Sequence, residues 1–98
     1  MSFKHIILTI DYSLDNYAYE MAEILRERGQ SCDVDVRNVG IHNKLDNAEN
    51  LDYDFILVIN QLMVEINSVV VRENKTKMNI NQKQMKLTDF MHHIWVNS

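Results

Sequence analysis

The chain has 98 residues, 14 acidic and 10 basic side chains, a formal net charge of −4 and a single cysteine. This length predicts one domain over 1–98 with a core of its own. The negative charge argues against a general nucleic-acid binder, and the lone Cys32 excludes an internal disulfide and fits a reducing compartment. No apolar run has the length of a membrane span. We expect a cytoplasmic protein, or a mitochondrial one if a targeting segment has been removed.

A strand and a helix are expected in the first thirty residues. Lys4 to Ile10 is predicted as a strand whose apolar centre is nearly continuous, which favours an interior position in a sheet. Ser13 is a good N-cap for a helix that follows. Its apolar residues recur at helical spacing: Leu14, Tyr17, Ala18, Met21 and either Ile24 or Leu25. Gly29 stands where a glycine ends such a helix.

The segment from Cys32 to Arg37 alternates apolar and charged residues. This pattern is typical of a half-exposed strand, so we place it at the edge of the sheet. Cys32 falls on the buried face and is predicted to be a packed, unreactive thiol. Asp33 and Asp35 share the other face, where we expect them to be solvated.

A turn at Asn38-Val39-Gly40 leads into a short helix. The helix is predicted from four apolar residues, Ile41, Leu45, Ala48 and Leu51. We assign Lys44 to its polar, solvent-facing side.

The stretch Phe55 to Ile59 is five apolar residues long and rich in β-branched types. A strand without polar alternation is buried on both faces, which requires a largely parallel sheet with helices above and below. The sequence therefore predicts an α/β fold in three layers. We expect a mixed five-stranded sheet in the order 2-1-3-4-5, with strands 1–3 parallel and about three helices.

The remaining elements are a hairpin and a closing helix. Val69 to Val71 is predicted as the fourth strand and Lys77 to Ile80 as a weaker fifth, joined by a loop at 73–76. Residues 81–84 are polar and expected to be irregular. The last helix is predicted from Leu87, Phe90, Met91 and Ile94.

Signals for chemistry are sparse. The only glycines are Gly29 and Gly40, so no glycine-rich loop could hold a phosphate. Adjacent His92 and His93 would point about 100° apart on a helix, which predicts surface histidines and no metal site. We therefore expect no cofactor, no metal and no catalytic residues. Five cations in the second part of the chain form either a basic face or solvated lysines on a hairpin: Arg72, Lys75, Lys77, Lys83 and Lys86.

The order of elements and several short strings resemble one known family. The strings are Tyr17-Ala18, Asp35-Val36-Arg37-Asn38, Lys44-Leu45, Phe55-Ile56-Leu57-Val58 and Val69-Val70-Val71-Arg72. Together they resemble the C-terminal anticodon-binding domain of class II aminoacyl-tRNA synthetases, and the threonyl type most closely. The resemblance runs from about Lys4 to Ile94.

The chain departs from this family at several positions. Val39 and Gly40 replace a Glu-Lys pair, Asp46 replaces an arginine, and Asp54-Phe55 replaces a Pro-Tyr pair. Two family glycines fall at Asn60 and Asn67, which we expect to keep the backbone because asparagine best tolerates a positive φ.

The resemblance implies that the turn after the second strand and the start of the second helix face a tRNA anticodon loop. Arg37, Asn38 and Lys44 are the candidate RNA-binding residues. For each there is an ordinary alternative: Arg37 pairs with a neighbouring aspartate, Asn38 shapes the turn, and Lys44 is solvated.

Three functions stay open at this point. The first is an anticodon-binding module of a synthetase, acting in tRNA recognition and not in catalysis. The second is an accessory or protein-interaction domain that has lost anticodon reading, its partner a protein or a synthetase catalytic domain. The third, by fold analogy alone, is a small flavodoxin-like ligand binder, which the missing phosphate loop disfavours.

Overall fold

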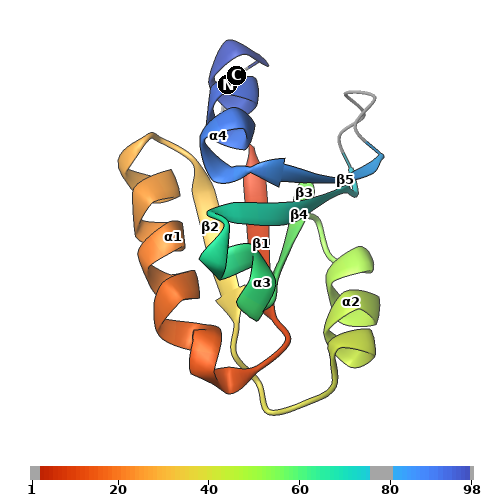
Figure 1. The fold of residues 1–98 in the computed structure, drawn as a ribbon. Helices are drawn as coiled ribbons and strands as arrows, with labels where there is room; N and C mark the ends of the chain where they lie inside the picture. Colours follow the sequence, from red (N-terminus) through yellow and green to blue (C-terminus); the bar gives the residue numbers. More distant parts are fainter. Residues whose placement is uncertain (1–2, 76–80, 98) are drawn as a thin grey trace.

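The computed structural model describes residues 3–75 and 81–97, and within them five strands form one mixed sheet (Figure 1). The order is β2-β1-β3-β4-β5, as predicted from the sequence. The parallel strands are β1 (Lys4–Thr9), β2 (Ser31–Asp35) and β3 (Phe55–Ile59). Two antiparallel strands, β4 (Ser68–Glu73) and β5 (Gln82–Lys86), extend the sheet beyond β3.

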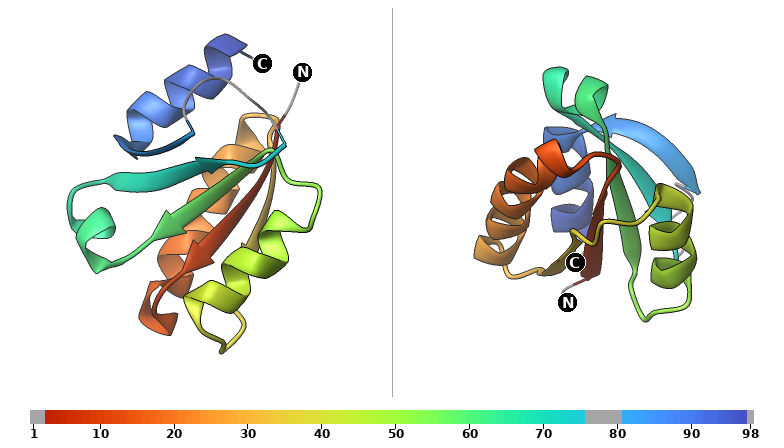
Figure 2. Two further views of the ribbon diagram at one scale, coloured as in Figure 1. Left: turned by 90° about the vertical axis from the view of Figure 1, so that its right-hand side faces the viewer. Right: turned by 90° about the horizontal axis from the view of Figure 1, so that it is seen from below.

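Helices cover both faces of the sheet, which gives the three layers expected. The right-hand view of Figure 2 shows α1 (Asp15–Glu27) and α4 (Leu87–Asn97) on one face and α2 (Ile41–Glu49) on the other. Two short elements complete the described chain: a 3-10 turn at Tyr12–Leu14 and α3 (Gln61–Glu65).

β3 lies in the middle of the sheet and divides the core into two parts. Leu57 packs into the larger cluster under α1 and α4, whereas Ile56 packs into the smaller cluster under α2. Four of the five β3 residues are fully buried, and only Val58 is half-buried. The strand 55–59 lacks polar alternation because it is buried on both faces, as inferred from the sequence.

The end of α1 follows the prediction, but its start does not. Gly29 adopts a φ of 81°, and the N–H groups of Gly29 and Gln30 donate to the carbonyls of Arg26 and Leu25, each at 3.0 Å. At the other end, Asp11 caps the 3-10 turn by accepting from the backbone N–H of Ser13 at 2.9 Å. The assignment of Ser13 as N-cap was wrong, because an aspartate two residues earlier takes that role.

The fifth strand differs from its prediction. The expected strand at 77–80 lies entirely within 76–80, outside the described residues. The expectation that 81–84 is irregular was wrong, because β5 occupies Gln82–Lys86. Its side chains are mostly exposed, so it carries no apolar signal. Backbone pairing with β4, in which Val69 faces Met85, defines this strand.

The two asparagines at family glycine positions behave differently. Asn67 has a φ of 51°, as expected for a residue that tolerates the left-handed region. Asn60 is extended, with a φ of −127°, and its side chain accepts from the N–H of Met63 at 2.9 Å. Asn60 is therefore the N-cap of α3, a helix not predicted from the sequence, and the expected positive φ at Asn60 was wrong.

A buried histidine links the start of β1 to the rest of the core. The Gln30 amide oxygen accepts from the N–H of Phe3 at 2.8 Å and lies 3.2 Å from His5 Nε2. Because that oxygen can only accept, Nε2 carries the proton, and Nδ1 has no partner among the described residues. Burial lowers the pKa of His5, and the neutral ring stacks on Phe55 at 5.4 Å.

We expect Leu57→Ala to lower the free energy of unfolding by about 2–5 kcal/mol, through lost apolar burial and the cavity left in the main core. Urea unfolding followed by circular dichroism measures it. Leu62→Ala, at an exposed position of α3, is the matched control and should cost well under 1 kcal/mol. Equal urea midpoints for the two variants would contradict this placement of the core.

Candidate functional site

The carboxyl ends of β1, β2 and β3 lie at one end of the sheet because the three strands are parallel. In open α/β sheets this end is where ligands bind. The loop 36–40 and the start of α2 lie there, at the bottom of Figure 1. Arg37 and Asn38 are both exposed on this loop. The N–H of Val39 donates to the carbonyl of Arg37 at 2.9 Å, so Asn38 stands at the centre of a tight three-residue turn.

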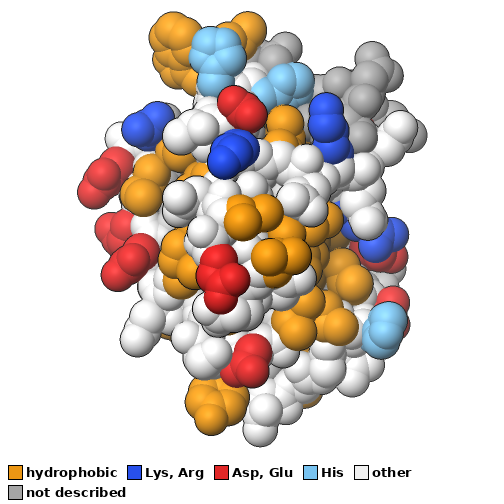
Figure 3. Space-filling model, viewed as in Figure 1, with side chains coloured by type: hydrophobic (Ala, Val, Ile, Leu, Met, Phe, Trp, Pro, Cys, Tyr) orange, Lys and Arg blue, Asp and Glu red, His pale blue; other side chains and the backbone are white. Residues whose placement is uncertain are grey.

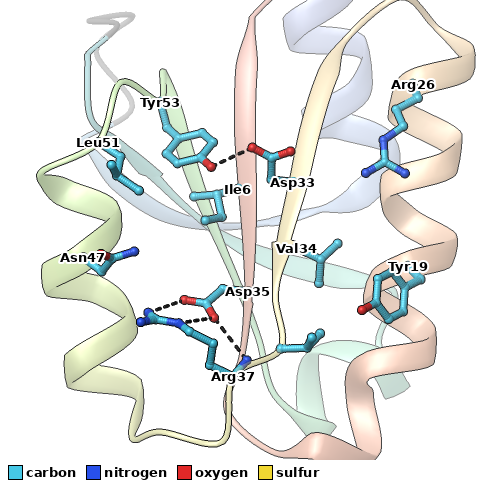
Figure 4. Close-up of a pocket in the computed structure, with 11 residues that line it drawn as sticks. Ile6, Tyr19, Arg26, Asp33, Val34, Asp35, Arg37, Asn47, Leu51 and Tyr53 are labelled. Carbon is cyan, nitrogen blue, oxygen red and sulfur yellow. Dashed lines mark hydrogen bonds and ion pairs between the residues drawn. The ribbon is translucent and has the colours of Figure 1, made fainter.

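Arg37 is held by a fork of hydrogen bonds to Asp35 (Figure 4). Its Nε donates to Oδ1 at 2.9 Å and its Nη2 to Oδ2 at 2.7 Å, while the Arg37 backbone N–H donates to Oδ1 at 3.2 Å. Asp35 is only 7% exposed, whereas the Arg37 side chain is 52% exposed. The expectation that Asp35 is solvated was therefore wrong, because this partner compensates its burial.

The charges around Asp35 favour its ionised form. The hydrogen bonds from Arg37 hold the pKa of the Asp35 carboxyl below its ordinary value, and the ammonium of Lys44 adds a smaller contribution. Two of the Arg37 N–H donors are used in this way, which leaves the rest of an exposed, oriented guanidinium for a ligand.

Lys44 lies in the interior, opposite to its predicted place on the solvent-facing side of α2. It is 4% exposed, and its Nζ donates to the Thr9 carbonyl at 3.0 Å and to Thr9 Oγ1 at 3.3 Å. Thr9 Oγ1 in turn donates to Asp15 at 2.9 Å. Positions 41, 44, 45 and 48 form one inner stripe of a helix, so the spacing could have revealed this placement. A direct contact between Lys44 and RNA would require these bonds to be given up.

A shallow groove of about 520 Å³ runs along the exposed edge of β2 beside the Asp35–Arg37 pair (Figure 4). In it the Tyr53 hydroxyl donates to Asp33 at 2.7 Å, and burial together with this bond raises the pKa of Tyr53 well above its ordinary value. Arg26 donates to the carbonyl of Cys32 from Nη2 at 2.6 Å and from Nε at 3.1 Å. These contacts occupy polar groups of the edge strand and stabilise it.

Other sequence-derived candidates are spread over the molecule. Arg72 pairs with Glu49 at 2.8 Å, and Lys77 lies outside the described residues. On the face drawn in Figure 3, the Lys and Arg side chains stand apart from one another, so that face carries no dense basic patch. Asp46 is exposed on α2.

The remaining titratable groups give no sign of catalytic chemistry. Cys32 is buried, as predicted, and burial raises the pKa of its thiol to about 12, so the thiol is protonated. Within 3–75 and 81–97, no three His, Cys, Asp or Glu side chains are placed to hold one metal ion. No helix in the described part of the chain is long and apolar enough to cross a membrane.

Comparisons with known proteins agree with one another. Residues 4–95 match the Anticodon binding domain family. The chain is 30% identical over 88 residues to a threonine–tRNA ligase of Agrobacterium fabrum, covering 86% of this chain and 13% of that protein. Its structure is similar to the RNA binding domain of threonyl-tRNA synthetase from Cryptosporidium parvum, with a TM-score of 0.85 at 22% identity over 96% of this chain and 23% of the other.

A histidyl-tRNA synthetase of S. aureus is similar as well, with a TM-score of 0.76 at 22% identity. This match covers 95% of the chain and 23% of that synthetase. The chain thus spans between about an eighth and a quarter of the proteins that it matches.

The Asp35–Arg37 pair should make the free energy of unfolding depend on pH in the acidic range. The pKa of Asp35 in the folded protein lies below its unfolded value of about 3.9. The ionised carboxylate therefore makes its full contribution to the free energy of unfolding above about pH 3.9, and this contribution is lost as the pH falls through the folded pKa. We expect Asp35→Asn to lose less stability than wild type when the pH falls from 7 to 3. Asp46→Asn, at an exposed carboxylate, is the control and should follow wild type.

We expect Lys44→Ala to lower the free energy of unfolding by about 1–3 kcal/mol, because two buried oxygens of Thr9 lose their donor. Lys75→Ala removes an exposed lysine and should stay within about 0.5 kcal/mol of wild type. Thermal unfolding of the two variants side by side measures the difference. A Lys44 variant as stable as the Lys75 variant would mean that its ammonium is not held at Thr9.

Proposed function

The chain belongs to the anticodon-binding domain family of class II aminoacyl-tRNA synthetases, and from this membership we propose that it is a tRNA-binding module of the threonyl type. Its role is recognition of the anticodon loop, without catalysis. The chemistry of aminoacylation belongs to a separate catalytic domain, which we propose as its partner.

The observation that carries this proposal is the exposed loop at the carboxyl ends of the parallel strands. Unstacked RNA bases are read through hydrogen bonds at their edges and through stacking, with cations at the phosphates. The Asn38 amide offers both a donor and an acceptor at the tip of a tight turn. Arg37 offers a flat cation whose orientation is already set by Asp35, so little side-chain entropy is lost on binding.

Lys44 supports the same surface from below in this proposal. Its ammonium joins α2 to the end of β1 through Thr9. The start of α2 and the loop before it are therefore held in place relative to the sheet. We assign Lys44 a positioning role and leave the RNA contacts to Arg37 and Asn38.

A second function is favoured by the charges at the same surface. The fork of Arg37 is directed at Asp35, the Lys44 ammonium is buried, and Asp46 presents a negative charge where the family has an arginine. These features suit an accessory domain that binds a protein, such as a synthetase catalytic domain, and no longer reads an anticodon.

A titration with tRNA carrying threonine anticodons, at low and at physiological salt, separates the two functions. We expect weak binding that strengthens at low salt, because phosphate contacts release counterions. Arg37→Ala should weaken binding and flatten its salt dependence. Asp46→Arg should strengthen binding, because it restores a cation beside the loop.

Glu20→Arg makes the same charge change at an exposed site on α1 and serves as the control for Asp46→Arg. Thermal melts of each variant show that the fold is retained. If no variant binds tRNA even at low salt, the accessory function replaces the first proposal. If Arg37→Ala, Asp46→Arg and wild type bind equally, the RNA surface lies elsewhere on the domain.

A further inference from the structure

The turn between β1 and α1 presents an exposed aromatic ring at the same end of the molecule as the loop 36–40. Tyr12 begins this 3-10 turn and is 84% exposed. Among the large hydrophobic side chains that the structure describes, it is the most exposed. So little of the ring is removed from water that it adds little to the stability of the fold. A flat aromatic face in water is, however, a suitable surface for the ring of a ligand to stack on.

The backbone on both sides of Tyr12 is fixed, although its ring lies in water. The Asp11 carboxylate accepts from the N–H of Ser13 at 2.9 Å, and the Asp11 carbonyl accepts from the N–H of Leu14 at 3.0 Å. Leu14 is itself buried in the larger core cluster. The ring is thus attached to a well-held turn. Only its own two side-chain torsions remain to be ordered when a ligand stacks on it.

Thr9 joins this turn to the loop 36–40. Its hydroxyl donates to Asp15 at 2.9 Å, which brings the two ends of the segment 10–14 together. Its carbonyl accepts from Nζ of Lys44 at 3.0 Å, which holds the start of α2 at the same point. The loop 36–40 leads directly into α2. Both connections are therefore anchored at Thr9, and Figure 1 shows them together at the bottom of the molecule.

The charge beside Tyr12 favours contact with a base over contact with a phosphate. Asp11 is exposed, and its hydrogen bonds from Ser13 hold the pKa of its carboxyl below the ordinary value, so it is ionised near neutral pH. This carboxylate repels a phosphate but not the flat face of an uncharged base. The cation is supplied by the other connection, where Arg37 follows the strand that pairs with β1.

We propose that Tyr12 stacks on one base of the RNA loop that Arg37 and Asn38 contact. This role rests on the function proposed for the loop 36–40. The ring holds an unstacked base by its flat face, the Asn38 amide reads a base edge, and the Arg37 guanidinium takes a phosphate. Because every base has a flat face, stacking selects poorly among bases. Tyr12 therefore supplies affinity, and Asn38 supplies selectivity.

The affinity of the whole chain for a tRNA transcript with a threonine anticodon, measured across a range of salt concentrations, tests this contact. Tyr12→Leu keeps an apolar side chain but removes the flat ring, and should weaken binding about tenfold. Tyr12→Phe is the matched control, since it keeps the ring, and should bind like wild type. Because stacking releases no counterions, Tyr12→Leu should leave the salt dependence of binding unchanged, whereas Arg37→Ala flattens it.

A second experiment separates a base contact from a change in the shape of the turn. Anticodon stem-loop RNAs are prepared with one anticodon base at a time replaced by an abasic site. Wild type should lose affinity when the base that stacks on Tyr12 is removed. Tyr12→Leu should lose nothing further at that position, because the contact is already absent. A turn that had only changed shape would weaken the binding of every RNA by the same factor.

The results distinguish failure of this role from failure of the proposed function. If Arg37→Ala weakens binding while Tyr12→Leu binds like wild type, the stacking role is overturned and the proposed function stands. The same holds if Tyr12→Phe is as weak as Tyr12→Leu, or if the abasic losses are equal in wild type and Tyr12→Leu at every position. If wild type binds neither RNA even at low salt, both proposals fail, and a protein contact becomes the alternative for this ring.

Discussion

The burial of β3 on both faces is the constraint on which the rest of the structure depends. A strand with apolar side chains on each side requires a layer of helices on each side, and Leu57 and Ile56 meet those two layers. Parallel pairing of β3 with β1, and of β1 with β2, then brings three carboxyl ends together. The candidate site is at this end because the core determines where the connecting loops lie.

The candidate site combines an exposed surface with charges held beneath it. Asp35 is buried only because Arg37 reaches back to it, and Lys44 is buried only because Thr9 accepts from its ammonium. Burying either charge without its partner would be costly. The same bonds that make the loop rigid also use part of the cationic surface that an RNA would require. The loop end therefore presents a small number of well-oriented polar groups.

The two ends of the molecule offer different chemistry. The loop end presents Arg37 and Asn38 on a turn above a network of paired charges, whereas the α4 end contains Gln30, a buried amide whose oxygen is held by the interior. That oxygen accepts from the backbone N–H of Phe3 and lies against His5. Both ends thus contain polar groups that are fixed by the interior.

The sequence by itself determined those helices and strands whose buried positions recur at a regular spacing of apolar residues. From the apolar run 55–59 and the order of elements around it we predicted the order of the sheet, which the structure has. The alternation that begins at Cys32 predicted the edge strand. Gly29 predicted the end of α1, and its φ of 81° agrees. The positive φ expected for an asparagine occurs at Asn67, but the same expectation was wrong at Asn60. Local rules apply to these features because each depends on neighbours a few residues away.

Only the tertiary structure decided the features that depend on distant partners. The burial of Lys44 is determined by Thr9, 35 residues earlier in the chain, and the burial of Asp35 by the orientation of Arg37. β5 is defined by its ladder with β4 and carries no apolar pattern of its own. A polar side chain can satisfy its hydrogen bonds in water or inside the protein, and its residue type is the same in both cases. Its place is therefore determined by contacts that form only when the chain has folded.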